Sequence, residues 1–276
     1  MKPSFSLKRQ LVVGALSVSL LAGCAAIDTT SSGSVGVQRK QYMSGLVSEA
    51  ELNQTAAQQY AQTIGNARSQ GALDVDAAQT ERVRKISQRL IQQVGVFRPD
   101  AVNWTWEVHV LKSDDVNAWC MPGGKMAIYS GLIQKINATD DELAAVMGHE
   151  IAHALREHSR EQVSQQMTTN IGLSVLSAVV GNSAVGDLGG TLSEVMFTLP
   201  NSRTHELEAD RIGVELAARA GYDPRAAISL WEKMASLSTS GGPPEILSTH
   251  PSPQSRIADL QIAAERVLPL YQSAQK

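Results

Sequence analysis

The chain has 276 residues, of which 43% are hydrophobic and only 4% aromatic, and its formal net charge is −3. This composition supports one large domain with a core of Leu, Val, Ile and Ala, which favours a helix-rich fold. Because there is no surplus of basic residues to displace counterions from phosphate, the charge excludes a general nucleic-acid-binding protein.

Residues 1–23 have the pattern of a bacterial export signal. Three basic residues precede an apolar run that starts at Leu11 and is shorter than the roughly 20 residues that span a membrane. The run ends in LAGC at residues 21–24, which resembles the lipobox, where cleavage leaves a lipidated cysteine. We therefore expect a signal peptide over 1–23 and membrane attachment through a lipid on Cys24. Since residue 25 is Ala rather than Asp, the resemblance implies an outer-membrane lipoprotein facing the periplasm of a Gram-negative bacterium.

The stretch after this signal is rich in Ser, Gly and Thr and poor in large apolar residues. It predicts a flexible tether over residues 24–45, followed by a folded domain over 46–276. The chain has two cysteines, so a lipid on Cys24 leaves Cys120 without a disulfide partner. The apolar neighbours of Cys120 favour a small buried side chain over a reactive thiol.

Helical periodicity begins near residue 46 and is clearest over residues 79–95. Residues 103–113 alternate between apolar and polar side chains and predict a strand, on which His109 is a surface or hydrogen-bonded histidine rather than a ligand. A turn with two glycines then precedes a second predicted strand at Lys125–Tyr129.

The next helix has a well-marked start, because Thr139 and Glu142 fit a capping box, and we expect it to run to His158. Residues 171–200 are apolar and interrupted by five glycines. A membrane-facing lid, a substrate-contacting hairpin of helices and core packing are all open interpretations, but the segment is too broken to span a bilayer. Further helices are predicted over 203–220, from Asp223-Pro224 and after Pro253.

Residues 149–153 match H-E-x-x-H. Two histidines four residues apart share a helix face, so His149 and His153 can bind one metal ion while Glu150 reaches a water on it. Zinc suits these ligands and keeps an open position when the protein supplies three. The preceding Gly148 would allow close approach of another element. The third ligand should come from a different element, and residues 201–213 are the richest acidic candidate.

At this point the chain resembles the gluzincin metallopeptidases of the HtpX and BepA type, which include the lipoprotein LoiP. Their H-E-x-x-H is followed by E-x-x-x-D on a later helix, here Glu206 to Asp210. The resemblance implies an α+β, mainly helical, zincin-like domain with a small sheet beside the H-E-x-x-H helix. It implies one Zn²⁺ per chain with Glu206 as the third ligand. Asp210, one turn further on the same face, would hydrogen-bond a ligand imidazole. Helical geometry turns Glu208 away from Glu206, and we expect it in solvent.

Several neighbours of these motifs are not expected to bind metal. His205 is adjacent to the third ligand in sequence but not on its face, so we interpret it as a non-ligand. Glu157, His158 and Glu161 lie beyond the metal-facing turns, and we expect them to meet solvent or neighbouring loops.

Three further pieces match the same family: residues 117–132, 202–203 and 250–256. By resemblance His250 is a regulatory fourth ligand; the alternative is a loop histidine fixed by the next proline. Arg256 would pair with a buried carboxylate or a substrate group. Cys120 departs from the small or apolar residue usual in the family. The second strand would align an extended substrate by strand addition, through four residues: Met126, Ala127, Ile128 and Tyr129.

The function implied by this resemblance is a zinc endopeptidase that acts on misfolded or unassembled envelope proteins. Glu150 would be the general base, and His250 or Arg256 would stabilise the oxyanion. Its partners would be polypeptide substrates, the membrane and the outer-membrane assembly machinery, with no nucleic acid. The alternative is a chaperone-like assembly factor for outer-membrane proteins with little proteolysis. A purely structural zinc is disfavoured, because two histidines and a glutamate leave an open site.

Overall fold

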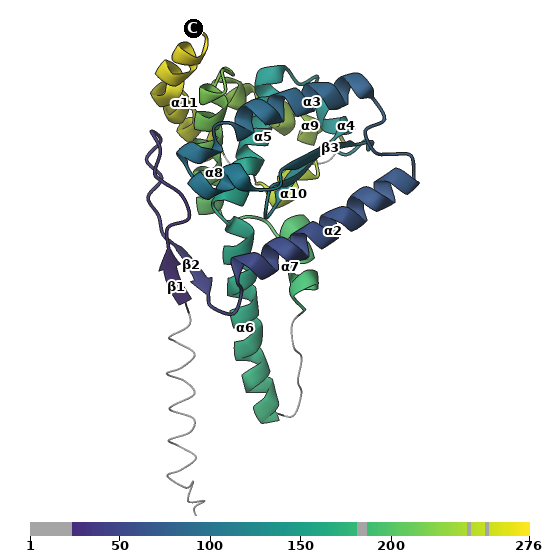
Figure 1. Cartoon of the computed structure of the whole chain (residues 1–276), viewed down its shortest axis with the longest axis vertical. Coiled ribbons are helices and arrows are strands. Elements are labelled where there is room, and N and C mark those ends of the chain that lie inside the picture. The colour runs from purple at the N-terminus through teal and green to yellow at the C-terminus, as the bar shows by residue number, and fades with distance from the viewer. Residues whose placement is uncertain (1–23, 181–186, 242–243, 252–253) are drawn as a thin grey trace, which may run out of the picture.

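The computed structural model describes residues 24–180, 187–241, 244–251 and 254–276 (Figure 1). The predicted signal peptide over 1–23 lies outside these residues. The described part is mainly helical with two small sheets, which confirms the expected α+β class.

Every strand of the described residues lies in the first half of the chain. This half comprises β1 (Cys24–Ile27), β2 (Gln41–Ser44), α2 (Glu49–Ser69), α3 (Ala77–Ile91), two short 3-10 helices (Val94–Val96 and Pro99–Asn103), β3 (Glu107–Leu111), β4 (Ala118–Met121) and β5 (Lys125–Tyr129). The second half is helical: α4 (Ser130–Lys135), α5 (Asp140–Leu155), α6 (His158–Val180), α7 (Leu188–Phe197), α8 (Arg203–Arg219), α9 (Ala226–Gly241), α10 (Ile246–Thr249) and α11 (Gln254–Ala274).

Helices α5 and α8 form the centre of the domain and pack against each other at a pair of glycines. A Cβ on Gly148 would lie 2.7 Å from the backbone oxygen of Gly213, and a Cβ on Gly213 would lie 2.6 Å from the backbone nitrogen of His149. Real side chains do not tolerate such contacts, so the two backbones can approach this closely only because both residues are glycine. The predicted role of Gly148 in a close approach is confirmed.

The start of α5 is as predicted, but its end is not. Thr139 and Glu142 form the capping box, each side chain accepting from the other's backbone N–H. The helix ends at Leu155, and Glu157 adopts a φ of 51° before α6 begins at His158. Arg98 and Arg160 hold the Glu157 carboxylate at 2.7 and 2.8 Å, which stabilises this break in the helix.

The three-stranded sheet has the order β3-β5-β4, parallel between β3 and β5 and antiparallel between β5 and β4. The strand predicted at Lys125–Tyr129 is confirmed in its bounds, whereas β4 was not predicted. Because β5 is the central strand, both of its edges are already paired. The prediction that Met126, Ala127, Ile128 and Tyr129 align a substrate by strand addition is therefore wrong. Among the described residues β4 pairs with β5 alone, so its other edge is free.

Residues 24–45 are not the flexible tether that their composition predicted. β1 and β2 pair with each other, and the backbone between them, residues 28–40, lies against the domain; we call this segment the N-terminal strap. Val35 and Val37 are buried in the main core, and the backbone N–H of Val35 donates to Glu215 at 2.9 Å. These few apolar anchors and buried hydrogen bonds order a segment that is otherwise polar.

The apolar segment 171–200 spans the end of α6 and all of α7, and residues 181–186 between them lie outside the described part. Helix α6 extends away from the body of the molecule, with α7 beside its upper part (Figure 1). Leu192 and Val195 of α7 are buried in a second apolar cluster that includes Trp119 of β4. No helix in the described residues combines the length and the apolar character needed to cross a bilayer.

Candidate metal centre

Four buried side chains from three parts of the chain converge at one point. Helix α5 contributes His149 and His153, α8 contributes Glu206, and His250 follows directly after α10. One potential ligand atom of each lies within 4.8 Å of those of the other three. In the described part of the chain, no other group of three or more His, Cys, Asp or Glu side chains gathers this closely. We call these four residues the metal-centre group.

The distances within this group suit one zinc ion. The Nε2 atoms of His149 and His153 lie 3.0 Å apart. Glu206 directs one carboxylate oxygen to each of them, at 3.6 Å from His149 and 3.4 Å from His153. Two imidazole nitrogens and one carboxylate oxygen are ligands that zinc prefers, with one coordination position left. The three predicted ligands are therefore brought together in a donor set that fits zinc.

Asp210 lies behind His149, as predicted. Its Oδ1 lies 2.9 Å from Nδ1 of His149, and Arg256 donates to both of its oxygens at 2.7 Å. Burial opposes ionisation of Asp210, but the charge of Arg256 outweighs it and lowers the pKa of this carboxyl. An ionised carboxylate only accepts hydrogen bonds, so Nδ1 of His149 carries the proton and Nε2 presents its lone pair to the centre.

Arg256 joins two carboxylates of the site. Its Nη1 lies 2.7 Å from Glu206, in addition to its bonds to Asp210, and its guanidinium stacks 3.9 Å from the ring centroid of Trp231. The predicted pairing of Arg256 with a buried carboxylate is thus present.

Glu150 and His250 face each other across the site. Glu150 is buried, and its Oε1 makes no hydrogen bond to any described residue; the Nε2 of His250 lies 3.6 Å away. Burial raises the pKa of Glu150, as would suit a general base. Burial opposes protonation of His250, but the charges of Glu206 and Glu150 raise its pKa to about 9. Without a metal, His250 therefore carries a positive charge into the group.

Comparison with known proteins bears on this geometry. The model of peptidase family M48 matches residues 77–264. The chain belongs to peptidase family M48. It is 39% identical over 175 residues to the mitochondrial metalloendopeptidase OMA1 of Arabidopsis thaliana, covering 62% of this chain and 34% of that protein. It is 32% identical over 208 residues to the beta-barrel assembly-enhancing protease of Escherichia coli, covering 71% of this chain and 41% of that protein. The matches span about a third to a half of the relatives' length.

A cavity opens on the M48 site beside the free edge of β4. Its wall includes Glu150 and His153 on one side and Phe197 of α7 on another. Its lining comprises Asn117, Ala118, Trp119, Cys120, Glu150, His153, Ser159, Gln162, Val195, Met196, Phe197, Asn201, Glu245, Thr249 and His250. Cys120 is buried in the core, as expected, and burial raises the pKa of its thiol, so it is not a thiolate. Because the cavity borders β4 and reaches Glu150, an extended chain bound along β4 would pass this carboxylate.

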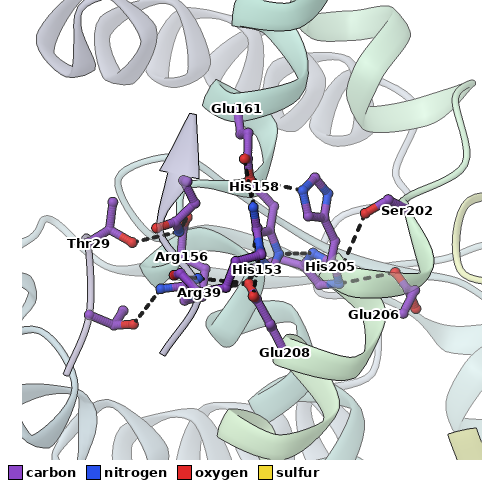
Figure 2. A network of polar contacts seen from close by, with 12 residues as sticks. Thr29, Arg39, His153, Arg156, His158, Glu161, Ser202, His205, Glu206 and Glu208 are labelled. Carbon is purple, nitrogen blue, oxygen red and sulfur yellow. Dashed lines mark hydrogen bonds and ion pairs between the residues drawn. The ribbon is translucent and has the colours of Figure 1, made fainter. Parts of the chain in front are cut away.

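Glu208, which we expected in solvent, is buried. Three residues that we expected to meet solvent or neighbouring loops are buried against neighbouring segments: Glu157, His158 and Glu161. Helical periodicity identifies the face that points away from Glu206, but it does not reveal that the N-terminal strap covers that face. Arg39 of the strap bonds Glu208 at 2.6 Å and Glu161 at 2.8 Å (Figure 2). We call Arg39, Arg156, His158, Glu161, His205 and Glu208 the arginine cluster. This cluster depends on the long-range pairing of Arg39 with Glu161 and Glu208, which no local sequence motif predicts.

The remaining histidines of the M48 chain make the contacts of non-ligands. His205 lies outside the metal-centre group, donates from Nε2 to Glu161 at 3.0 Å, and stacks on His158 with ring centroids 4.3 Å apart. His109 lies 2.7 Å from Asp74. Burial and the positive groups around it lower the pKa of His158 well below the ordinary value, so this ring is neutral.

Proposed function

We propose that this M48 chain is a zinc-dependent endopeptidase. The observation that carries the proposal is the convergence of His149, His153 and Glu206, with the buried Glu150 beside them. Three carboxylates, those of Glu150, Glu206 and Asp210, lie at the site and face the one guanidinium of Arg256. A divalent cation would balance this excess of negative charge, and the donor set favours zinc.

The proposed mechanism assigns the proton transfers to Glu150. When bound, zinc supplies Lewis acidity that polarises the scissile carbonyl and activates the attacking water. Glu150, with its raised pKa, takes a proton from that water and delivers it to the leaving amine. The Nε2 of His250 lies 3.6 Å from Glu150, where a ring N–H would donate to the developing oxyanion, while Arg256 is held by Asp210 and Glu206.

The substrate would be an extended polypeptide that adds as a strand to β4. The free edge of β4 borders the cavity that reaches Glu150, and backbone pairing selects for an extended chain more than for particular side chains. This mode of binding suits unfolded proteins, because their backbone is not yet paired.

We further propose that the protein is anchored in the outer membrane by a lipid on Cys24, faces the periplasm and removes misfolded or unassembled envelope proteins. The lipobox-like LAGC at 21–24 supports the anchor. The similarity to the beta-barrel assembly-enhancing protease of Escherichia coli supports a link to outer-membrane assembly, whereas the OMA1 relatives are mitochondrial by name. The export pattern at the N-terminus favours the bacterial envelope.

The test of the peptidase proposal is cleavage of an unstructured reporter polypeptide. The purified protein should cut it at internal bonds, lose this activity with a chelator and regain it with stoichiometric zinc. Mass spectrometry of the products separates an endopeptidase from an exopeptidase. Activity that persists in excess chelator would refute the proposal.

The second candidate is a chaperone-like assembly factor that rarely cuts. The position of His250, whose Nδ1 lies 3.3 Å from the Nε2 of His149, favours it, because a histidine there can fill the open ligand position and keep the site latent. On the latency proposal, His250→Ala raises basal proteolysis; a fall in activity would instead make His250 a catalytic residue. Complete rescue of a deletion strain by Glu150→Gln would favour the chaperone over the protease.

A further inference from the structure

The second ring nitrogen of His153 contacts another histidine rather than a carboxylate. Nδ1 of His153 lies 2.9 Å from Nδ1 of His158, and both rings are buried. Its fellow ligand, His149, instead uses Asp210 for this contact. The two proposed ligands are thus supported by different chemistry.

The break between α5 and α6 brings these two rings together. On an unbroken helix, residues 153 and 158 would point about 140° apart around the axis. The left-handed Glu157 redirects the chain, so that His158 faces back to His153 (Figure 2). The ring centroids are 4.8 Å apart.

The hydrogen bond between His158 and Glu208 determines which ring nitrogens of His158 and His153 carry a proton. Nε2 of His158 lies 3.1 Å from Oε2 of Glu208, which as a carboxylate only accepts, so Nε2 carries the proton. A neutral imidazole has one donor, which leaves Nδ1 of His158 as an acceptor. His153 must then donate from its Nδ1, and its Nε2 presents a lone pair toward His149 and Glu206.

Two arginines hold Glu208 in place. Arg156 donates to its Oε2 at 2.9 Å, and Arg39 donates to its Oε1 at 2.6 Å (Figure 2). Arg156 also donates to the backbone oxygen of Arg39 at 2.8 Å. Arg39 belongs to the N-terminal strap, so the strap contributes directly to this chain of contacts.

We propose that His158 and Glu208 are positioning residues for the metal ligand His153, and that Arg39 of the N-terminal strap and Arg156 fix Glu208 for this purpose. The relay sets the tautomer of His153 and orients its ring. This inference rests on the proposed metal centre. It gives the N-terminal strap a role in positioning one of the metal ligands.

The arginine cluster contains matched controls for this relay. Glu161 is buried like Glu208 and also binds Arg39, but it contacts His205 and not His158. His205 is buried and stacks on His158, and its ring nitrogen Nε2 bonds to Glu161 rather than to His153. Removing Glu161 or His205 therefore disturbs the same cluster and leaves the relay in place.

The test is the zinc affinity of folded protein, measured by competition with a chromophoric chelator. Loss of a hydrogen-bond partner behind a metal ligand weakens binding about 10- to 100-fold, which we expect for His158→Phe and Glu208→Ala. His158→Asn should recover most of this loss, because its side-chain oxygen can accept from Nδ1 of His153. His205→Phe and Glu161→Ala should change the affinity by less than about threefold, since neither touches the ligand.

Thermal unfolding of each variant in excess chelator reports stability without metal and identifies any variant that does not fold. If His158→Phe does not fold, the Glu208→Ala and Glu161→Ala pair gives the same comparison. Equal zinc affinity in the relay variants and their controls would overturn the inference while leaving the metal centre intact. Wild-type protein that binds no zinc would refute the metal centre itself, and the inference with it.

Discussion

The metal-centre group and the arginine cluster contact opposite nitrogens of the His153 ring, and both combine histidine and glutamate side chains, some of them from α8. They differ in charge. In the metal centre the carboxylates of Glu150, Glu206 and Asp210 face one guanidinium, that of Arg256. In the arginine cluster two carboxylates, Glu161 and Glu208, meet two guanidiniums, Arg39 and Arg156.

This difference shows why histidine and glutamate together do not define a metal site. The arginine cluster is already neutral, so a cation would have to displace a guanidinium. In the metal centre the excess negative charge attracts a proton to His250, whose pKa rises to about 9. A divalent ion would supply the same compensation through direct bonds.

The largest expected effect is the loss of peptidase activity in Glu150→Gln. Glutamine cannot take up the proton of the attacking water, so cleavage of the reporter polypeptide should fall by about 10²- to 10⁴-fold. Zinc should stay bound, because Glu150 is not one of the ligands. Glu161→Gln makes the same change in the arginine cluster and should retain most of the activity. If both variants lost activity to a comparable extent, the metal centre and the arginine cluster would not differ in their contribution to catalysis.

Arg156→Met should be the most destabilising change in the arginine cluster. It leaves the buried Glu208 with Arg39 as its only guanidinium partner, and removing one member of a buried pair costs about 3 kcal/mol or more. Urea unfolding in excess chelator measures this loss without a contribution from metal. As a control, Arg225→Met removes an exposed partner of Asp223 and should leave the free energy of unfolding nearly unchanged. Similar stability in both variants would show that Glu208 does not need its arginines.

Zinc should stabilise the wild-type protein against heat. Free zinc at about 100 times its dissociation constant adds about 2.7 kcal/mol to the free energy of unfolding, provided that the unfolded chain does not bind it. Glu161→Gln should show the same gain, because the arginine cluster is not a ligand set. His149→Ala should show little or none. Equal gains in all three proteins would place the zinc elsewhere.

The smallest expected effect is on the stability of the fold at acid pH. Burial would raise the pKa of Glu161, but hydrogen bonds from Arg39 and His205 outweigh it and lower the pKa to about 2 from its ordinary value near 4.5. A depressed carboxyl pKa stabilises the fold fully above the unfolded value and progressively less as the pH falls from about 4.5 toward 2. Without metal, Glu161→Gln should therefore be less stable than wild type at pH 6, with a difference that shrinks below pH 4.5. A constant difference across this range would contradict the contribution of the ionised carboxylate.

Local sequence rules predicted the parts of the site that depend on one helix. The capping box fixes where α5 starts, four-residue spacing puts His149 and His153 on one face, and the glycine of α5 allows α8 to approach. The E-x-x-x-D motif then supplies Glu206 and Asp210 from α8, by resemblance rather than by periodicity.

Features that depend on distant contacts were missed. Periodicity shows that Glu208 points away from Glu206, but only the fold reveals that Arg39, 169 residues earlier, covers it. The short strand β4 has no alternating pattern because all four of its residues are buried, so the strand order was not predictable. The strap has the composition of a linker, and two buried valines with a few hydrogen bonds are enough to dock it.

The most direct measurement is the zinc content of three proteins after equilibration with zinc and removal of the excess: wild type, Glu206→Gln and Glu161→Gln. Each substitution neutralises one buried carboxylate, the first in the metal centre and the second in the arginine cluster. We predict one zinc per chain in wild type and in Glu161→Gln, and close to none in Glu206→Gln. Zinc retained by Glu206→Gln, or lost from Glu161→Gln, would contradict the assignment of the metal to His149, His153 and Glu206.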